Sequence, residues 1–219
     1  MTRPQAWPRI PPLGVEAFLG TPTGRAYAEI AAQAFEGLLA DRPPPNVLRT
    51  LAHHRELFPA MMPLLAHVAG EVLPARDREI AILRTAWRSQ APYIWAHHHP
   101  AGLAAGLSNA DIARIASEEP GGWAPFESAL LRAVDELHAG SVISADTWRS
   151  IAGRYHRDQA LELMVLAGTY RTLAYVLNSC QVPIDTWLPR PAPLPPGPAH
   201  AARFESDWSG WFRASSGSA

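Results

Sequence analysis

The sequence predicts an all-α fold, in the form of a single-domain helical bundle flanked by proline-rich extended arms. Between two proline clusters, apolar residues recur at helical spacing and short breakers separate the segments, whereas no run alternates apolar and polar residues as a half-buried strand would. The chain has 219 residues, of which 47% are hydrophobic, which is enough for one well-buried core.

The expected helices follow from this periodicity and from the prolines and glycines that interrupt it. In chain order they cover residues 24–40, 46–53, 58–73, 75–89, 93–106, a short segment that starts near Ser108 and Asp111, 125–139, 145–155 and 158–179. Residues 24–187 therefore form the predicted helical domain.

Prolines define the two arms. An N-terminal arm, residues 1–23, contains Pro4, Pro8, Pro11 and Pro12, and a C-terminal tail, residues 188–219, contains six prolines between 189 and 198. The tail also carries four aromatic residues within residues 204–212. Because buried aromatic side chains remove large apolar areas from water, we expect this tail to dock on its own core, on a neighbouring subunit or over the site.

The composition excludes several classes of function. The net charge is −1 without a block of like charges, so neither a nucleic-acid partner nor a polybasic membrane contact is expected. All 19 basic residues are arginine, a usage typical of high-GC bacteria, and the absence of lysine excludes a lysine Schiff base. With Cys180 as the single cysteine, no dithiol couple can form within one chain.

The location expected from the sequence is the cytoplasm. The first thirty residues lack a basic segment followed by an apolar one, as a signal peptide would have. The most apolar stretch, residues 161–177, is interrupted by Glu162 and Arg171 and falls short of about 20 apolar residues, the length that spans a bilayer. We interpret it as a buried central helix.

Residues Arg76 to Ile115 read RDREIAILRTAWRSQAPYIWAHHHPAGLAAGLSNADIARI. This stretch resembles the core of the carboxymuconolactone decarboxylase and alkylhydroperoxidase D-like superfamily, in which an Arg-x-Arg-Glu helix precedes a Trp-Ala-His-His turn. The segments 127–148 and 161–185 are similar to later parts of longer members. The resemblance implies an all-α fold, a homo-oligomer (dimer, trimer or hexamer), and a pocket where the Glu-bearing helix meets the His-bearing helix.

The sequence also departs from the family at its chemical positions. When Glu79 and His98 are aligned with the catalytic Glu and His of the peroxidase-type members, Ala91 and Ile94 occupy the two cysteine positions. Many members without cysteines carry a second Glu where this chain has Ile94. The resemblance thus implies a non-redox member that lacks both the thiols and the second carboxylate.

Glu79, His98 and His97 are the candidate catalytic residues. If Glu79 faces inward, desolvation raises its pKa and makes it a proton donor or acceptor; the alternative is a structural carboxylate paired with Arg76 or Arg84. Three adjacent histidines rotate by about 100° each and cannot share one pocket. A His-dependent metal site is the less favoured alternative, and we predict no metal, because helical ligand pairs usually sit four residues apart.

The candidate substrate-binding residues are Arg84, Trp87, Tyr93, Trp95, Tyr170 and Asn178. Arg84 would hold an anion, the three aromatic residues between positions 87 and 95 would line the pocket, and the resemblance places Tyr170 and Asn178 at the same cavity. Cys180 has no basic neighbour in sequence that would activate it, and we expect it to be inert.

These residues lead to two expectations for function. The first is a cofactor-independent enzyme that moves a proton in a small organic acid or lactone, by decarboxylation, isomerisation, dehydration or cyclisation, in a specialised biosynthetic or catabolic pathway. The second is a binding or scaffold protein that kept the fold and lost the chemistry.

Overall fold

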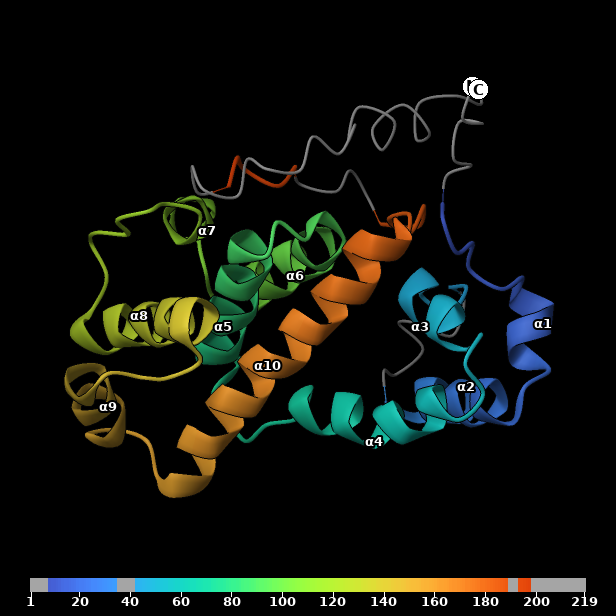
Figure 1. Ribbon diagram of the computed structural model, residues 1–219, viewed down its shortest axis with the longest axis horizontal. Coiled ribbons are helices and arrows are strands. Elements are labelled where there is room, and N and C mark those ends of the chain that lie inside the picture. Colours follow the sequence, from blue (N-terminus) through green and yellow to red (C-terminus); the bar gives the residue numbers. More distant parts are fainter. Residues whose placement is uncertain (1–7, 35–41, 189–192, 198–219) are drawn as a thin grey trace. The chain divides into compact units, whose positions relative to one another are not determined.

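The structure, a computed structural model, describes residues 8–34, 42–188 and 193–197, and within these ranges every regular element is a helix. Figure 1 shows the helices in chain order. They are α1 (Val15–Leu19), α2 (Pro22–Ala34), α3 (Asn46–Leu51), α4 (Leu57–Val68), α5 (Ala75–Arg88), α6 (Pro92–Ala104), α7 (Asn109–Ile115), α8 (Pro125–Gly140), α9 (Ala145–Ala152) and α10 (Arg157–Cys180). The all-α prediction is confirmed.

Most helix boundaries lie within a few residues of the sequence predictions, because the caps and breakers act locally. Ser108 precedes α7 and accepts a hydrogen bond from the Asp111 amide, while the Asp111 carboxylate accepts one from the Ser108 amide. This reciprocal arrangement is a capping box, and it fixes the start of α7. Pro92 occupies the first turn of α6, where a missing N–H costs nothing.

The N-terminal arm differs from the expected extended segment, since α1 forms within it at residues 15–19. Phe18 explains this helix: its side chain is fully buried, and its ring lies 5.9 Å from that of Tyr27 and 5.8 Å from that of Phe58. A non-local contact therefore stabilises a helix too short for sequence periodicity to reveal. The predicted end of α2 at residues 35–40 and the aromatic tail at 204–212 lie outside the described residues.

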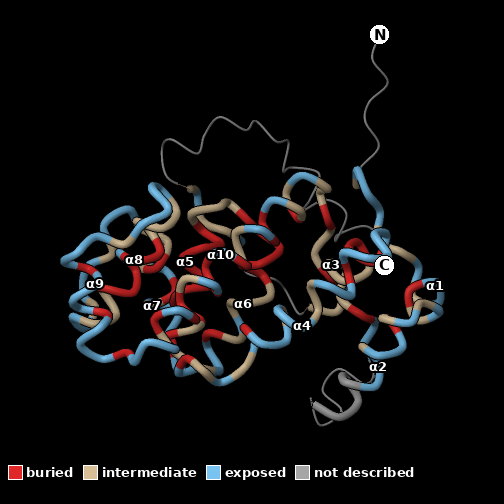
Figure 2. Tube along the Cα trace, turned by 60° about the horizontal axis from the view of Figure 1, so that its bottom comes forward, coloured by how far each residue is buried: buried red, intermediate tan, exposed pale blue. Residues whose placement is uncertain are grey.

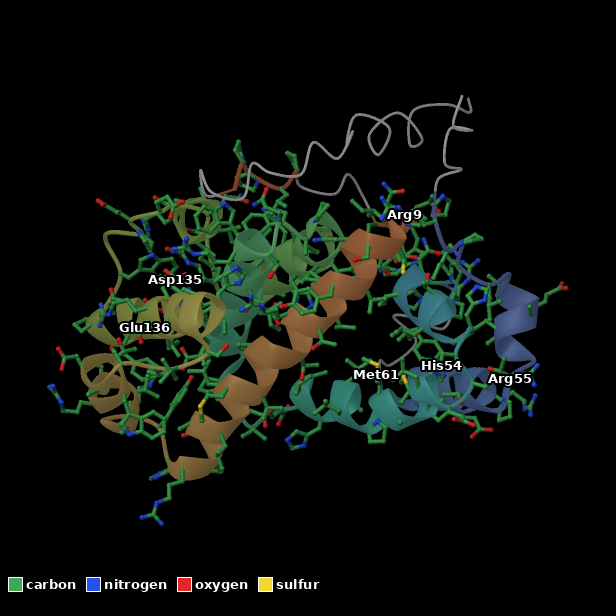
Figure 3. All side chains as sticks on the ribbon, viewed as in Figure 1. Arg9, His54, Arg55, Met61, Asp135 and Glu136 are labelled. Atoms are coloured by element: carbon green, nitrogen blue, oxygen red, sulfur yellow. The ribbon has the colours of Figure 1, made fainter. Side chains whose placement is uncertain are left out.

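The chain divides into two compact units, one built from residues 1–67 and 176–189 and the other from residues 68–175 and 190–219. In the first unit, the Asp185 carboxylate accepts a hydrogen bond from the Asn46 amide at the start of α3. Arg9 donates to the Ser179 carbonyl at the end of α10, and Figure 3 shows Arg9 at that helix end. Residues from the first part of the chain and residues at the end of α10 and just after it thus pack together in this unit.

In the second unit, α5 is the central helix and packs against α6, α7 and α8. Its residues 79–87 are all buried, and Figure 2 shows this buried stretch along the trace. A helix that is buried on every side must satisfy each of its polar side chains internally. The polar groups of α5 are therefore the natural place to look for a site.

Helix α10 is long and apolar enough to cross a membrane by length and composition alone. However, 44% of the residues in its most apolar window are buried within the protein. The core helix of a soluble protein meets the same criteria.

Candidate functional site

Helices α5 and α6 bring Glu79 and His98 together. Glu79 lies in the second turn of α5, and His98 lies in the middle of α6, 19 residues later. The short connection at residues 89–91 turns the chain back, so α6 packs directly on α5. Buried Ile80 and Leu83 on α5 and Ile94 on α6 contribute to the surrounding apolar core.

The His98 Nδ1 atom lies 2.8 Å from Glu79 Oε2, which is a hydrogen bond between side chains. The Glu79 side chain is 4% exposed and that of His98 is 20% exposed. The carboxylate is therefore inside the unit, whereas the imidazole reaches towards the surface. Glu79 holds the ring, and the ring is the group that a ligand can contact.

The pKa of Glu79 is lowered, contrary to the rise expected from the sequence. Burial by itself raises it, but the nearby His98 ring and the Arg78 guanidinium lower it by more. The Nε atom of Arg78 lies 3.4 Å from Glu79 Oε1. Desolvation disfavours the charged carboxylate, and two hydrogen-bonding partners that favour it outweigh that effect. Glu79 is thus an ionised, orienting carboxylate.

The ionised carboxylate fixes the tautomer of His98. A carboxylate can only accept hydrogen bonds, so Nδ1 carries the proton and donates a hydrogen bond to Glu79. In the neutral ring, Nε2 is then a basic nitrogen with a free lone pair, and no described residue donates to it. Such a carboxylate–imidazole pair is suited to general base or acid chemistry.

Tyr170 of α10 completes the surroundings of the pair. Its ring lies 5.0 Å from that of His98 in an edge-on arrangement, with an interplanar angle of 86°. Burial raises the pKa of Tyr170, and the charge of Glu79 raises it further. The phenol therefore stays protonated and can donate a hydrogen bond beside the imidazole.

The sequence suggests that Arg84 holds an anion, but in the structure its guanidinium group binds other residues of the protein. Its side chain is fully buried; Nε and Nη2 each donate to an oxygen of Asp135 at 2.7 Å, and Nη1 donates to the Ile115 and Ser117 carbonyls. Asp135 and its neighbour Glu136 are labelled on α8 in Figure 3. Because Arg84 donates four hydrogen bonds inside the unit, its guanidinium group connects helices and is not free to bind a ligand.

Trp87 belongs to the same internal structure. Its ring contacts two cations, since the guanidinium carbon of Arg84 lies 4.6 Å from the ring centroid and that of Arg88 lies 4.9 Å away. Its Nε1 atom donates to the Pro196 carbonyl at 3.0 Å. Trp87 therefore anchors the described segment 193–197 on α5.

The three consecutive histidines diverge, as their 100° rotation requires. His97 stacks on Tyr93 with the ring centroids 4.5 Å apart, while His99 lies near Trp95 at 6.4 Å. Only His98 is hydrogen-bonded to Glu79. Tyr93 and Trp95, which also belong to α6, are buried and contribute to the hydrophobic core.

Four positions that the sequence singled out remain to be described. Asn178 belongs to the first unit, where its carbonyl accepts the Gln181 amide, and its role in the site stays a prediction. Burial raises the pKa of Cys180 although Arg9 opposes this, so the thiol is protonated at neutral pH. Ala91 and Ile94 are both buried.

Arg78 is the site residue that the sequence reasoning missed. Its Nη1 donates to the Gly70 carbonyl at 2.5 Å, which holds the guanidinium beside Glu79. The Arg-x-Arg-Glu motif contained the signal, since Arg78 directly precedes Glu79. Within the described ranges, no group of three or more His, Cys, Asp or Glu side chains could hold a metal ion.

Comparison with known proteins connects this geometry to a family. Residues 55–136, which include Glu79 and His98, match the model of the carboxymuconolactone decarboxylase family. No curated protein matches the chain. The match and the all-helical architecture agree with each other, and together they support membership of the carboxymuconolactone decarboxylase and alkylhydroperoxidase D-like superfamily.

Proposed function

We propose that this protein is a cofactor-independent, non-redox enzyme that moves a proton in a small organic acid or lactone, by decarboxylation, isomerisation, dehydration or cyclisation. The hydrogen bond from His98 Nδ1 to Glu79 Oε2 carries the proposal. It orients a partly exposed imidazole whose Nε2 is available to a ligand. The family match supports decarboxylase-like chemistry.

In this mechanism Nε2 of His98 takes a proton from the substrate and returns it at another atom. Glu79 stabilises the imidazolium that forms in between and stays ionised, because its pKa is lowered. Tyr170 is the nearby neutral donor that stabilises developing negative charge on a substrate oxygen. The arginine that pairs with the Glu79 carboxylate is Arg78 and not Arg84.

The test is turnover of γ-carboxymuconolactone and a panel of β-keto acids, followed by mass spectrometry. We expect His98→Asn to lower turnover by about 10²- to 10⁴-fold, which is the usual contribution of a general base. Glu79→Gln should also lower it. His99→Asn is the matched control, since His99 lies beside Trp95 rather than Glu79. Equal turnover in the native protein and His98→Asn contradicts the proposal.

A second candidate is a non-catalytic binding protein of the same fold. It is favoured by the structural use of Arg84 and by the apolar residues at positions 91 and 94. In that case no substrate in the panel turns over, and Glu79→Gln and His98→Asn leave the affinity for a bound ligand unchanged. Calorimetric titration of the native protein and both variants separates the two functions.

We also propose a soluble, cytoplasmic homo-oligomer, in keeping with the family resemblance. Trp148 and Leu161 are large apolar side chains that are 42% and 60% exposed, and an assembly would bury such groups. Light scattering on the purified chain gives the subunit number, and a monomer at all concentrations contradicts this proposal.

A further inference from the structure

A second concave site lies in the unit of residues 68–175, away from the Glu79–His98 pair. It is a half-open groove of about 380 Å³ between α5, α8 and α10. Thr85, Val134, Met164, Gly168, Arg171 and Tyr175 are among its lining residues, whereas Glu79, His98 and Tyr170 are not. This volume is within the range of small-molecule sites, roughly 300–1,000 Å³.

Arg171 is held in a fixed position at the wall of the groove. Its Nη1 atom donates to the His138 carbonyl at 2.6 Å and to the Leu137 carbonyl at 3.4 Å, and its Nε donates to the Tyr175 hydroxyl at 2.7 Å. The two carbonyls lie in the last turn of α8, so part of the guanidinium caps that helix. The two N–H groups of Nη2 have no acceptor among the described residues.

Among the described residues, Arg171 lacks the carboxylate partner that most arginines of this unit have. Seven arginines form ion pairs with carboxylates, namely Arg76, Arg78, Arg84, Arg88, Arg114, Arg149 and Arg154. Within the part of the chain that the structure describes, Arg171 has no carboxylate partner, and no acidic side chain lines the groove. The α8 carbonyls offset only part of a unit charge.

Tyr175 adds a second donor next to the free edge of Arg171. Because its oxygen accepts from Arg171 Nε, its own hydroxyl proton is directed elsewhere. An anion placed at this edge would receive N–H bonds from Nη2 and an O–H bond from Tyr175. A carboxylate with its two oxygens matches such a pair of donors.

The rest of the groove combines apolar side chains with the polar residues Thr85, His138, Ser141 and Thr172. Val134, Leu137, Met164 and Ala167 contribute to its walls, and Gly168 leaves space because no side chain projects there. We propose that this groove binds a small monocarboxylate with an apolar body, of the size of benzoate or hexanoate, with its carboxylate on Arg171 and Tyr175. This site does not depend on the function proposed for Glu79 and His98.

The test is calorimetric titration with benzoate and with its neutral analogue benzamide. We expect Arg171→Gln to weaken benzoate binding about tenfold or more, and Tyr175→Phe about threefold to tenfold, because each loses hydrogen bonds to the anion. Gly168→Leu should abolish binding by filling the groove while keeping every donor. Circular dichroism checks that each variant is folded, and Tyr175→Phe keeps the cap on α8 if Arg171→Gln does not fold.

His98→Asn is the control variant, and its benzoate affinity should equal that of the native protein. The proposal is overturned if benzamide binds as well as benzoate, or if Tyr175→Phe and Gly168→Leu both bind normally. It is also overturned if no heat is detected up to about 10 mM benzoate. Loss of binding in His98→Asn alone would place benzoate at the Glu79–His98 pair and overturn the groove site.

Discussion

Asp135 of α8 accepts hydrogen bonds from two arginines of α5, Arg84 and Arg88, with Nε of each at 2.7 Å from Oδ1 and Nη2 of each bonded to Oδ2. Arg84 is fully buried, and Arg88 also pairs with Glu118. One carboxylate thus joins the central helix to α8 and, through Arg84, to the end of α7. The C-terminal half of α5 is thereby fixed against α8.

Replacing Asp135 by Asn should destabilise the fold by about 3–5 kcal/mol, because the buried Arg84 charge loses its partner. Chemical denaturation measures the change. The matched control is Asp146→Asn, which removes an ion pair with Arg149 in which both side chains are more than 70% exposed. Its cost should stay below about 1 kcal/mol. Equal costs for the two variants would show that Arg84 finds another partner.

Asp135 also predicts an acid-dependent loss of stability. Burial raises its pKa, but Arg84 and Arg88 lower it by more, so the folded value lies below the ordinary 3.8. A lowered carboxyl pKa gives stability that is present above the unfolded value and is lost as the pH falls through the folded value. The free energy of unfolding should therefore fall below about pH 4, and less steeply in Asp135→Asn.

Asp77 provides a control, because its pKa is shifted in the opposite direction from that of Asp135. Burial raises its pKa above 3.8 despite a hydrogen bond from Tyr155 and the nearby Arg154. Its contribution is present at low pH and is lost as the pH rises through the folded pKa. In Asp77→Asn the fall in stability on acidification should become steeper. The same slope in both variants would contradict the two assigned shifts.

The tautomer of His98 can be measured directly. With Glu79 as the acceptor, the neutral ring carries its proton on Nδ1, and long-range ¹H–¹⁵N correlation spectra distinguish the two ring nitrogens. In Glu79→Gln the tautomers should become mixed, because the amide can donate as well as accept. The His97 ring, which stacks on Tyr93, serves as the internal reference. An Nε2–H ring in the native protein would exclude the proposed base.

Replacing each of two helical glycines by alanine should have different effects on the stability of the protein. At Gly168 of α10 an added Cβ meets no atom within 4 Å, so Gly168→Ala should stabilise the protein by about 0.5–1 kcal/mol through helix propensity. At Gly102 of α6 the same atom would lie 3.1 Å from Leu83 Cδ1 and Leu107 Cδ1. Gly102→Ala should therefore gain less or lose stability. Thermal unfolding of both variants provides the comparison.

The sequence predicts local features of this protein better than distant ones. The capping box at Ser108 and Asp111 needs only residues three positions apart, and it is present in the structure. The role of Arg84 depends on Asp135, which is 51 residues away. Nothing in the periodicity of α5 distinguishes an arginine that faces α8 from one that faces a ligand, so the sequence alone does not separate the role of Arg84 from that of Arg78.

The Glu79–His98 contact was suggested by the family resemblance rather than by spacing. The direction of the Glu79 pKa could not be inferred in the same way. Burial was foreseeable, but the two partners that outweigh it were not, because their distances follow from how α6 packs on α5. Short contact distances and the electrostatics that depend on them require the three-dimensional structure.

The position of Glu79 and Arg84 on one rigid helix limits how this protein can diverge. Inserting a single residue between them would rotate one against the other by about 100° and shift it by about 1.5 Å. Either the bond to His98 or the bonds to Asp135 would then be lost. Evolution can alter this site by exchanging side chains, while changes of length are confined to surface loops such as residues 119–122.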